Sequence, residues 1–196
     1  KLQTDNLVQL HNSFILIQTE KGYYLVHQQN AHERILYERF AMAVDGKPIA
    51  TQQSLFPATM ELATADAVLL NELIPDMHQL GYQLEPFGSN TFVIQGTPAD
   101  ISGGGSQGAV SEKNAIEKML EQYKHFSSDL KFSKREKLLR SLALQQSVKA
   151  GTALSAKEMK VLVEDLFNCQ IPNSTANGKP TYLEFKKDEL DKLFGR

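Results

Sequence analysis

The sequence predicts an α/β fold of the α+β type, with small sheets and flanking helices. Two stretches place apolar runs on either side of turn residues, which is typical of β-hairpins. Other stretches repeat apolar residues at the spacing of one helix face. Hydrophobic residues make up 41% and charged residues 22% of the 196 residues, so the composition is that of a folded globular protein with one core or two small lobes.

The N-terminal part predicts a hairpin followed by a helix. Residues 14–17 and 23–26 are apolar runs, and residues 20–22 between them form a turn. Asn30, with Glu33 three residues on, resembles a capping box that starts a helix. Apolar residues then recur at helical spacing until a glycine and a proline end the helix. We therefore expect strand, turn, strand, helix.

The next part predicts an extended segment, a helix and a second hairpin. Residues 49–56 form the extended segment, which Pro57 should end. A helix begins at Thr64, and Pro75 should kink it or split it in two. Residues 82–94 combine apolar runs with a Gly-Ser-Asn turn, which predicts the second hairpin.

A glycine-rich stretch at residues 102–108 has too little side chain to pack, and we expect a flexible link there. Three amphipathic helices should follow it, and Ser155 with Glu158 forms a capping box before the third. Residues 168–180 should be a loop, and residues 181–185 and 186–194 a closing strand and a terminal helix. The apolar stripes of the three helices are Ile116, Met119, Leu120 and Tyr123; Leu138, Leu139, Leu142 and Ala143; and Met159, Leu162, Val163, Leu166 and Phe167.

The net charge and the cysteine content limit the kinds of function that this chain can have. A net charge of −2 gives no general attraction for a DNA backbone. The single cysteine, Cys169, makes no internal disulfide, and we expect it to be a small buried hydrophobic residue. No apolar run is long enough for a membrane span and no signal peptide is evident, so we expect a cytoplasmic protein without membrane contact. The start at Lys1, without Met, indicates a fragment of a longer chain.

Residues 23–40, YYLVHQQNAHERILYERF, resemble the signature of the C-terminal region of MutL-type DNA mismatch-repair proteins, in which a strand runs into DQHAxxERxxYE. Residues 87–101 look like the family's strand pair with its closing PA turn. Residues 143–151 fall where the family has ACHxxxKAG, and residues 178–181 fall within its CPHGRPT motif. The contiguous match consists of Ala31, His32, Glu33, Arg34, Ile35, Leu36, Tyr37 and Glu38.

The resemblance implies a two-lobed unit. Residues 1–57 and 175–196 would form an inner dimerisation lobe, and residues 58–174 an external regulatory lobe that is helical with a β-hairpin. It also implies a homodimer, which we expect to form through the strands of residues 14–26 and 181–185, and contacts with other mismatch-repair proteins. The family's ATPase would precede Lys1, so we expect no catalysis and no cofactor in this fragment.

The endonuclease-bearing members of the family hold metal ions through acidic, His and Cys residues of three motifs. Such ligands polarise the phosphate and activate water. This chain departs from the pattern, because only Glu33 keeps the family's acid, and Leu, Gln, Thr and Asn bind transition metals poorly. We interpret the site as degenerate, with no metal bound. Its positions are His27, Gln29, Asn30, Glu33, Leu144, Gln145, Thr175 and Asn177.

An alternative is an active metal-dependent nicking endonuclease with a rearranged ligand set. His27, His32 and Glu33 would be its remaining ligands. Ordinary structural roles compete with this interpretation. His32 is expected in the first turn of the helix, and a carboxylate at Glu33 would cap that turn and favour the positive end of the helix dipole.

A second short motif is QQSLFP, residues 52–57. It resembles the peptide by which bacterial DNA-processing proteins dock into a sliding clamp, and it lies where MutL proteins carry their clamp-binding segment. Gln52 would supply amide hydrogen bonds, while Leu55 and Phe56 would fill an apolar pocket. The competing interpretation is a short edge strand whose Leu55 and Phe56 belong to the core.

A standalone DNA-binding domain is the third function class. The acidic net charge and the absence of a dense basic stripe disfavour it. One modest basic patch is better explained as a solvated helix face, so we expect DNA contact to be weak or indirect. Its members are Lys131, Lys134, Arg135, Lys137 and Arg140.

Overall fold

The computed structural model describes residues 6–99 and 112–195, and the expected glycine-rich link at 102–108 lies outside them. The fold is α/β with antiparallel sheets, as predicted. The chain forms two compact units, Lys1–Glu38 with Gln146–Arg196, and Arg39–Gln145. These boundaries differ from the expected 57 and 174, because the extended segment at 51–61 pairs with the second sheet and the helix at 156–168 packs on the first. No helix in the described ranges has both the length and the apolar character of a membrane span.

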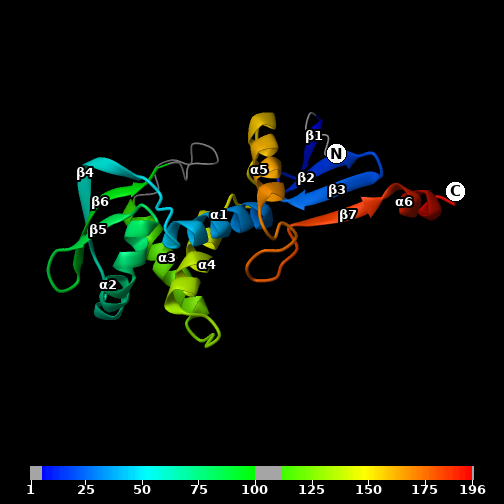
Figure 1. The fold of residues 1–196 in the computed structure, drawn as a ribbon. Helices are drawn as coiled ribbons and strands as arrows, with labels where there is room; N and C mark the ends of the chain where they lie inside the picture. The colour runs from blue at the N-terminus through cyan, green and yellow to red at the C-terminus, as the bar shows by residue number, and fades with distance from the viewer. Residues whose placement is uncertain (1–5, 100–111, 196) are drawn as a thin grey trace. The chain divides into compact units, whose positions relative to one another are not determined.

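The first unit contains a sheet in the order β1-β2-β3-β7, coloured blue and orange to red in Figure 1. All its neighbouring strands are antiparallel, and a two-residue turn joins β2 to β3, as the hairpin prediction required. The strand β1 was not predicted. The strands are β1 (Leu7–Leu10), β2 (Phe14–Thr19), β3 (Gly22–His27) and β7 (Tyr182–Lys186).

Gly22 is required by the close approach of β7 to the hairpin. A Cβ atom at this position would lie 2.0 Å from the backbone oxygen of Phe185. Its φ of +153° is also one that other residues rarely adopt. The turn residue at the start of β3 therefore determines how closely the edge strand can pair.

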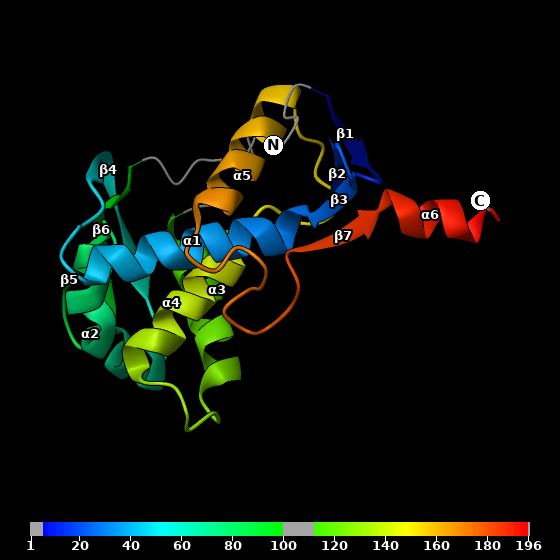
Figure 2. The ribbon, with the colours of Figure 1, turned by 45° about the vertical axis from the view of Figure 1, so that its right-hand side comes forward.

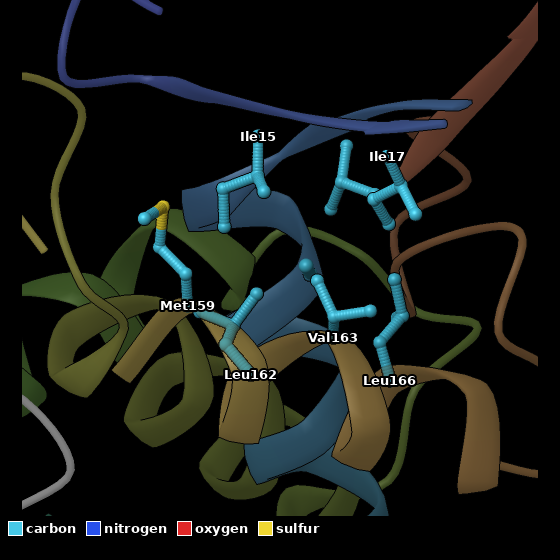
Figure 3. Close-up of a cluster of buried hydrophobic side chains, with 8 residues drawn as sticks. Ile15, Ile17, Met159, Leu162, Val163 and Leu166 are labelled. Atoms are coloured by element: carbon cyan, nitrogen blue, oxygen red, sulfur yellow. The ribbon is translucent and has the colours of Figure 1, made fainter. Parts of the chain in front are cut away.

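One face of this sheet carries the core of the unit. Helix α5 (Ala156–Asn168) begins with the predicted capping box of Ser155 and Glu158, and it lies across that face (Figure 2). In Figure 3, Ile15 and Ile17 of β2 point toward the side chains of α5. Burying such side chains contributes about 1.5–3 kcal/mol each. The cluster is Ile15, Ile17, Val26, Ala31, Met159, Leu162, Val163 and Leu166.

The second unit contains a three-stranded sheet in the order β4-β6-β5, against which α2 and α3 pack. Its strands are β4 (Thr51–Glu61), β5 (Gln83–Pro86) and β6 (Thr91–Pro98), and its helices are α2 (Thr64–Gln79), α3 (Glu112–Phe126) and α4 (Lys134–Gln146). Helix α1 (Gln28–Val44) begins in the first unit and ends in the second, whereas α6 (Lys187–Leu193) follows β7 in the first.

Two prolines lie inside elements that they were expected to end or interrupt. Pro75 lies inside α2, which is assigned as one helix, so the expected split is absent. Pro57 lies inside β4, because the strand resumes its pairing at Ala58 after a register shift. Pro57 lies in an edge strand and within the register shift, where a missing backbone N–H interrupts no pairing with β6.

Candidate functional site

His27 starts helix α1 and acts as its N-cap. Its Nδ1 accepts a hydrogen bond from the backbone N–H of Asn30 at 3.2 Å. The helix therefore begins two residues earlier than the expected start at Asn30, and the predicted Asn30 and Glu33 capping box is wrong. Burial lowers the pKa of His27, and the nearby charge of Lys179 lowers it further. The ring is thus held neutral, which suits a nitrogen that accepts a backbone N–H.

Glu33 lies in the second turn of α1 and does not cap the helix. Its side chain is buried, with 3% of the residue exposed. The amide Nδ2 of Asn177 donates to its Oε1 at 3.3 Å. Burial raises the pKa of Glu33, although Lys179 and Asn177 act in the opposite direction. Two of the predicted site positions, Glu33 and Asn177, therefore meet although they lie far apart in the sequence.

The loop that carries Thr175 and Asn177 is closed on itself and tied to α1. The Oγ1 atom of Thr175 accepts the backbone N–H groups of Asn177 and Lys179, each at 3.2 Å. Asn30 donates through Nδ2 to the backbone oxygen of Pro180 at 2.8 Å. Thr175 and Asn177, the two positions of this loop predicted to be degenerate, thus both take part in hydrogen bonds.

Residues 147–151 pack against the same end of α1. The backbone N–H of Val148 donates to Nδ1 of His32 at 2.9 Å, and that of Ala150 donates to Oε1 of Gln29 at 3.4 Å. His32 therefore holds a neighbouring turn in place, beyond the first-turn role expected of it. Leu144 and Gln145 are half-buried near the end of α4, in the part of the chain assigned to the second unit.

A buried amide that sequence reasoning missed supports this turn. Gln28 is fully buried, and its Nε2 donates to the backbone oxygens of Lys149 at 2.9 Å and Thr152 at 3.0 Å. Its Oε1 accepts from Gln9 of β1 at 2.7 Å. The signal was weak in the sequence, because a glutamine beside a strand gives no indication of burial.

The donor set at this site does not fit a transition metal. His27 Nδ1 accepts a helix N–H, Gln29 accepts a loop N–H, and Asn177 presents an amide nitrogen that has no lone pair for a metal. Glu33 is the one carboxylate among the family positions. Within residues 6–99 and 112–195, no three His, Cys, Asp or Glu side chains form a group placed to hold a metal ion.

A different surface of the first unit is apolar and uncovered. Strand alternation turns one set of side chains away from α5, onto what we call the outer face of the sheet. All of these side chains are half-buried or exposed, and Tyr23 stacks on Phe185 with ring centroids 4.9 Å apart. The outer face consists of Val8, Leu10, Phe14, Leu16, Tyr23, Leu25, Leu183 and Phe185.

The QQSLFP segment forms a bulge in the edge strand β4. Gln53 pairs with Gly96 and Ala58 with Ile94, so residues 54–57 oppose a single residue of β6. The bulge leaves Leu55 89% and Phe56 87% exposed. The interpretation of these two side chains as core is therefore wrong, whereas the predicted edge position is confirmed.

Two cations of the basic patch, Lys134 and Arg135, pair with acidic side chains of α2. Arg135 forms an ion pair with Asp76 at 2.9 Å, and Lys134 pairs with Glu72. Arg140 pairs with Glu136 at 2.8 Å and stacks over Phe132. Lys131, Lys134 and Arg135 are exposed, as expected of a solvated helix face, whereas Arg140 is buried, which corrects the expectation for that residue.

Comparison with known proteins decides the family. A sequence model described as the MutL C terminal dimerisation domain matches residues 7–154. The chain belongs to this MutL family. It is 35% identical over 96% of its length to a protein named DNA mismatch repair protein MutL from Chlorobium phaeobacteroides, of which it covers 29%. It is 36% identical over 96% of its length to the protein of that name from Chloroherpeton thalassium, of which it covers 28%.

The MutL match confirms the family that the four sequence blocks indicated. The match spans the strands β1 to β3, helix α1 and the bulge in β4, and it ends before the loop that carries Thr175 and Asn177. The chain spans less than a third of the curated MutL relatives that it matches, so those proteins contain further segments.

Proposed function

We propose that this chain is the homodimerisation and partner-docking module of a MutL-type mismatch-repair protein, with the outer face of the first sheet as its dimer interface. The observation that carries the proposal is the uncovered apolar outer face. One face of the sheet packs on α5, and the other exposes a contiguous set of apolar side chains to water. Exposed apolar patches of this kind normally mark protein–protein interfaces.

The dimer proposal is tested by a charge on that face. Leu183 lies beside Leu25 and is 52% exposed, so Leu183→Asp leaves the α5 side of the sheet intact. We expect a dimer for the wild-type chain and a monomer for the variant in sedimentation at micromolar concentration, because an obligate interface buries on the order of 2,000 Å² and tolerates no unpaired charge. Leu130→Asp, at an exposed position of the second unit, is the matched control. A monomeric wild-type chain would contradict the proposal.

The second part of the proposal is that the family's metal-dependent endonuclease site is degenerate here, so the fragment has no nuclease activity. The donor chemistry supports it. Glu33 is engaged by Asn177, and the ring nitrogen of His27 caps a helix. The rearranged-ligand alternative would need these contacts to break before a metal binds.

The test is nicking of supercoiled plasmid by the full-length protein with manganese or zinc, alongside Glu33→Lys. We expect the same background nicking from both proteins. Elemental analysis after dialysis should find less than stoichiometric zinc. Nicking that Glu33→Lys abolishes, or one zinc per chain, would restore the endonuclease alternative.

The third part is docking of a sliding clamp by the bulge in β4. The exposure of Leu55 and Phe56 supports it, because two large apolar side chains are presented on an edge strand without a role in the core. Two apolar anchors typically give binding of order micromolar or weaker. A dimer would present two copies of the motif, which strengthens attachment where both engage at once.

A direct binding measurement tests the clamp proposal. The chain should bind a bacterial sliding clamp in calorimetry, and Leu55→Ala with Phe56→Ala should abolish the heat of binding. Val68→Ala, another exposed apolar position of the second unit, should leave binding unchanged. Equal binding by the double variant would exclude the bulge as the docking site.

The same proposal assigns DNA only a weak or indirect role for this fragment. The acidic partners of Lys134 and Arg135 support it. A titration of duplex DNA at increasing salt should show weak binding that disappears by physiological ionic strength. Binding with a steep salt slope at that ionic strength would favour a DNA-binding module instead.

A further inference from the structure

The end of the terminal helix α6 carries three apolar side chains, Leu190, Leu193 and Phe194, which we call the stripe. Leu190 and Leu193 lie three residues apart on one side of the helix, and Phe194 is the C-cap residue that follows. Leu190 is half-buried, whereas the other two are exposed. Leu193 is 81% and Phe194 84% exposed, and no side chain of α6 is buried. A helix this short gains little stability from its own backbone, so its apolar side needs a partner surface.

The start of α6 is fixed to the first sheet. The backbone N–H of Lys187 donates to the oxygen of Lys21 in the β2–β3 turn at 2.8 Å. Beyond this anchor, Figures 1 and 2 both show α6 continuing from the end of β7, past that turn. Phe185, the last outer-face residue of β7, lies two residues before the helix. The stripe therefore follows the last outer-face residue of β7 closely along the chain.

We propose that α6 is a docking arm whose Leu193 and Phe194 pack on the outer face of a second copy of this chain. This inference rests on the homodimer proposed above. A second copy is the occupant that the observations favour, because the matched family model is a dimerisation domain and the stripe directly follows a strand of the proposed interface. A two-fold axis through that interface gives both copies the same contact, so each arm has a receiving sheet. The aromatic pair Tyr23 and Phe185 offers a suitable apolar surface there.

The arm is tested by Leu193→Ser with Phe194→Ser in the whole chain. Sedimentation equilibrium should give a dimer dissociation constant at least about tenfold higher than that of the wild type, since apolar side chains are lost from both arms. Leu130→Ser, which removes an equally exposed leucine from the second unit, should leave the constant unchanged. An unchanged constant in the double variant overturns the arm.

Leu183→Asp separates this failure from failure of the dimer interface. If Leu183→Asp is monomeric and the arm variant dimerises like the wild type, the arm is wrong and the sheet interface stands. If Leu183→Asp remains dimeric, the proposed sheet interface is wrong, and the docking-arm proposal, which depends on it, is wrong as well.

A cross-linking experiment locates the contact. In a Cys169→Ser background, tagged chains with Phe194→Cys are mixed with untagged chains carrying Leu183→Cys and treated with a mild oxidant. We expect a disulfide between tagged and untagged chains. A chain carrying both substitutions that links only within itself would show that α6 folds onto its own sheet, and would overturn the arm.

Discussion

The Nδ2 atom of Asn177 donates a hydrogen bond to Oε1 of Glu33, a residue 144 positions earlier in the chain. The resemblance described in the sequence analysis predicts that both positions correspond to metal-binding motifs of the family's endonuclease. Here the two side chains form a hydrogen bond with each other, within one chain. Burial still raises the pKa of Glu33, so an ionised carboxylate at this position is costly.

Glu33→Gln should therefore stabilise the fold increasingly as pH rises. Because the folded pKa lies above the unfolded one, the group's favourable contribution is complete at acidic pH and is lost as pH rises through the folded value. The isosteric amide has no such loss. Urea unfolding from pH 4 to pH 8 should show a gap between variant and wild type that opens with pH. The control is Glu121→Gln, at an exposed position. If the stability difference for Glu33→Gln is constant with pH, or equals that for Glu121→Gln, the raised pKa of Glu33 is contradicted.

His27 should make stability depend on pH in the opposite sense. Its folded pKa lies below the ordinary value, so the neutral ring stabilises the fold at neutral pH, and this contribution is lost as pH falls through the folded value. Protonation would also remove the acceptor that caps α1. His27→Asn keeps a capping oxygen but has no titrating group. Its free energy of unfolding should therefore fall less between pH 8 and pH 5 than that of the wild type. His27→Ala should cost about 1 kcal/mol at pH 8 in urea unfolding.

Leu55→Ala with Phe56→Ala should leave thermal stability nearly unchanged. Both side chains are in water, so the substitution removes almost no buried area. Met60→Ala, in the same strand but 1% exposed, is the contrasting variant and should cost about 2–5 kcal/mol. Differential scanning calorimetry measures both. A drop of many degrees for the double variant would show that the bulge folds into the core.

Cys169 should react slowly with alkylating reagents. It lies half-buried at the C-cap of α5, which corrects the expectation of a fully buried thiol. Burial, with the neighbouring Glu38 carboxylate, raises its pKa to about 12. The thiolate is the reactive species, so iodoacetamide at pH 8 should modify it at least about a hundredfold more slowly than free cysteine. Glu38→Gln should increase that rate, and an unchanged rate would point to access as the cause.

Local patterns in the sequence determined much of the fold. The β2–β3 hairpin, the α5 capping box and the apolar stripe of α5 follow from residues adjacent in sequence, and the structure confirms them. The prediction from local sequence patterns was wrong where a pattern was compatible with two structures. Asn30 looked like an N-cap, but the ring of His27, three residues earlier, supplies the capping acceptor.

Only the tertiary structure decided which candidate residues meet. The resemblance to the family grouped Glu33 with Asn177, but it gave no contact between them and no role for Lys179. The approach of these residues depends on the loop after α5 returning to α1. Likewise, QQSLFP is compatible with a core strand or a docking peptide. The register shift against β6 made the difference, since it moves residues 54–57 out of the ladder and places Leu55 and Phe56 in solvent. Local propensity depends on residues that are neighbours in the sequence, whereas strand register and burial depend on contacts between residues that are far apart in it.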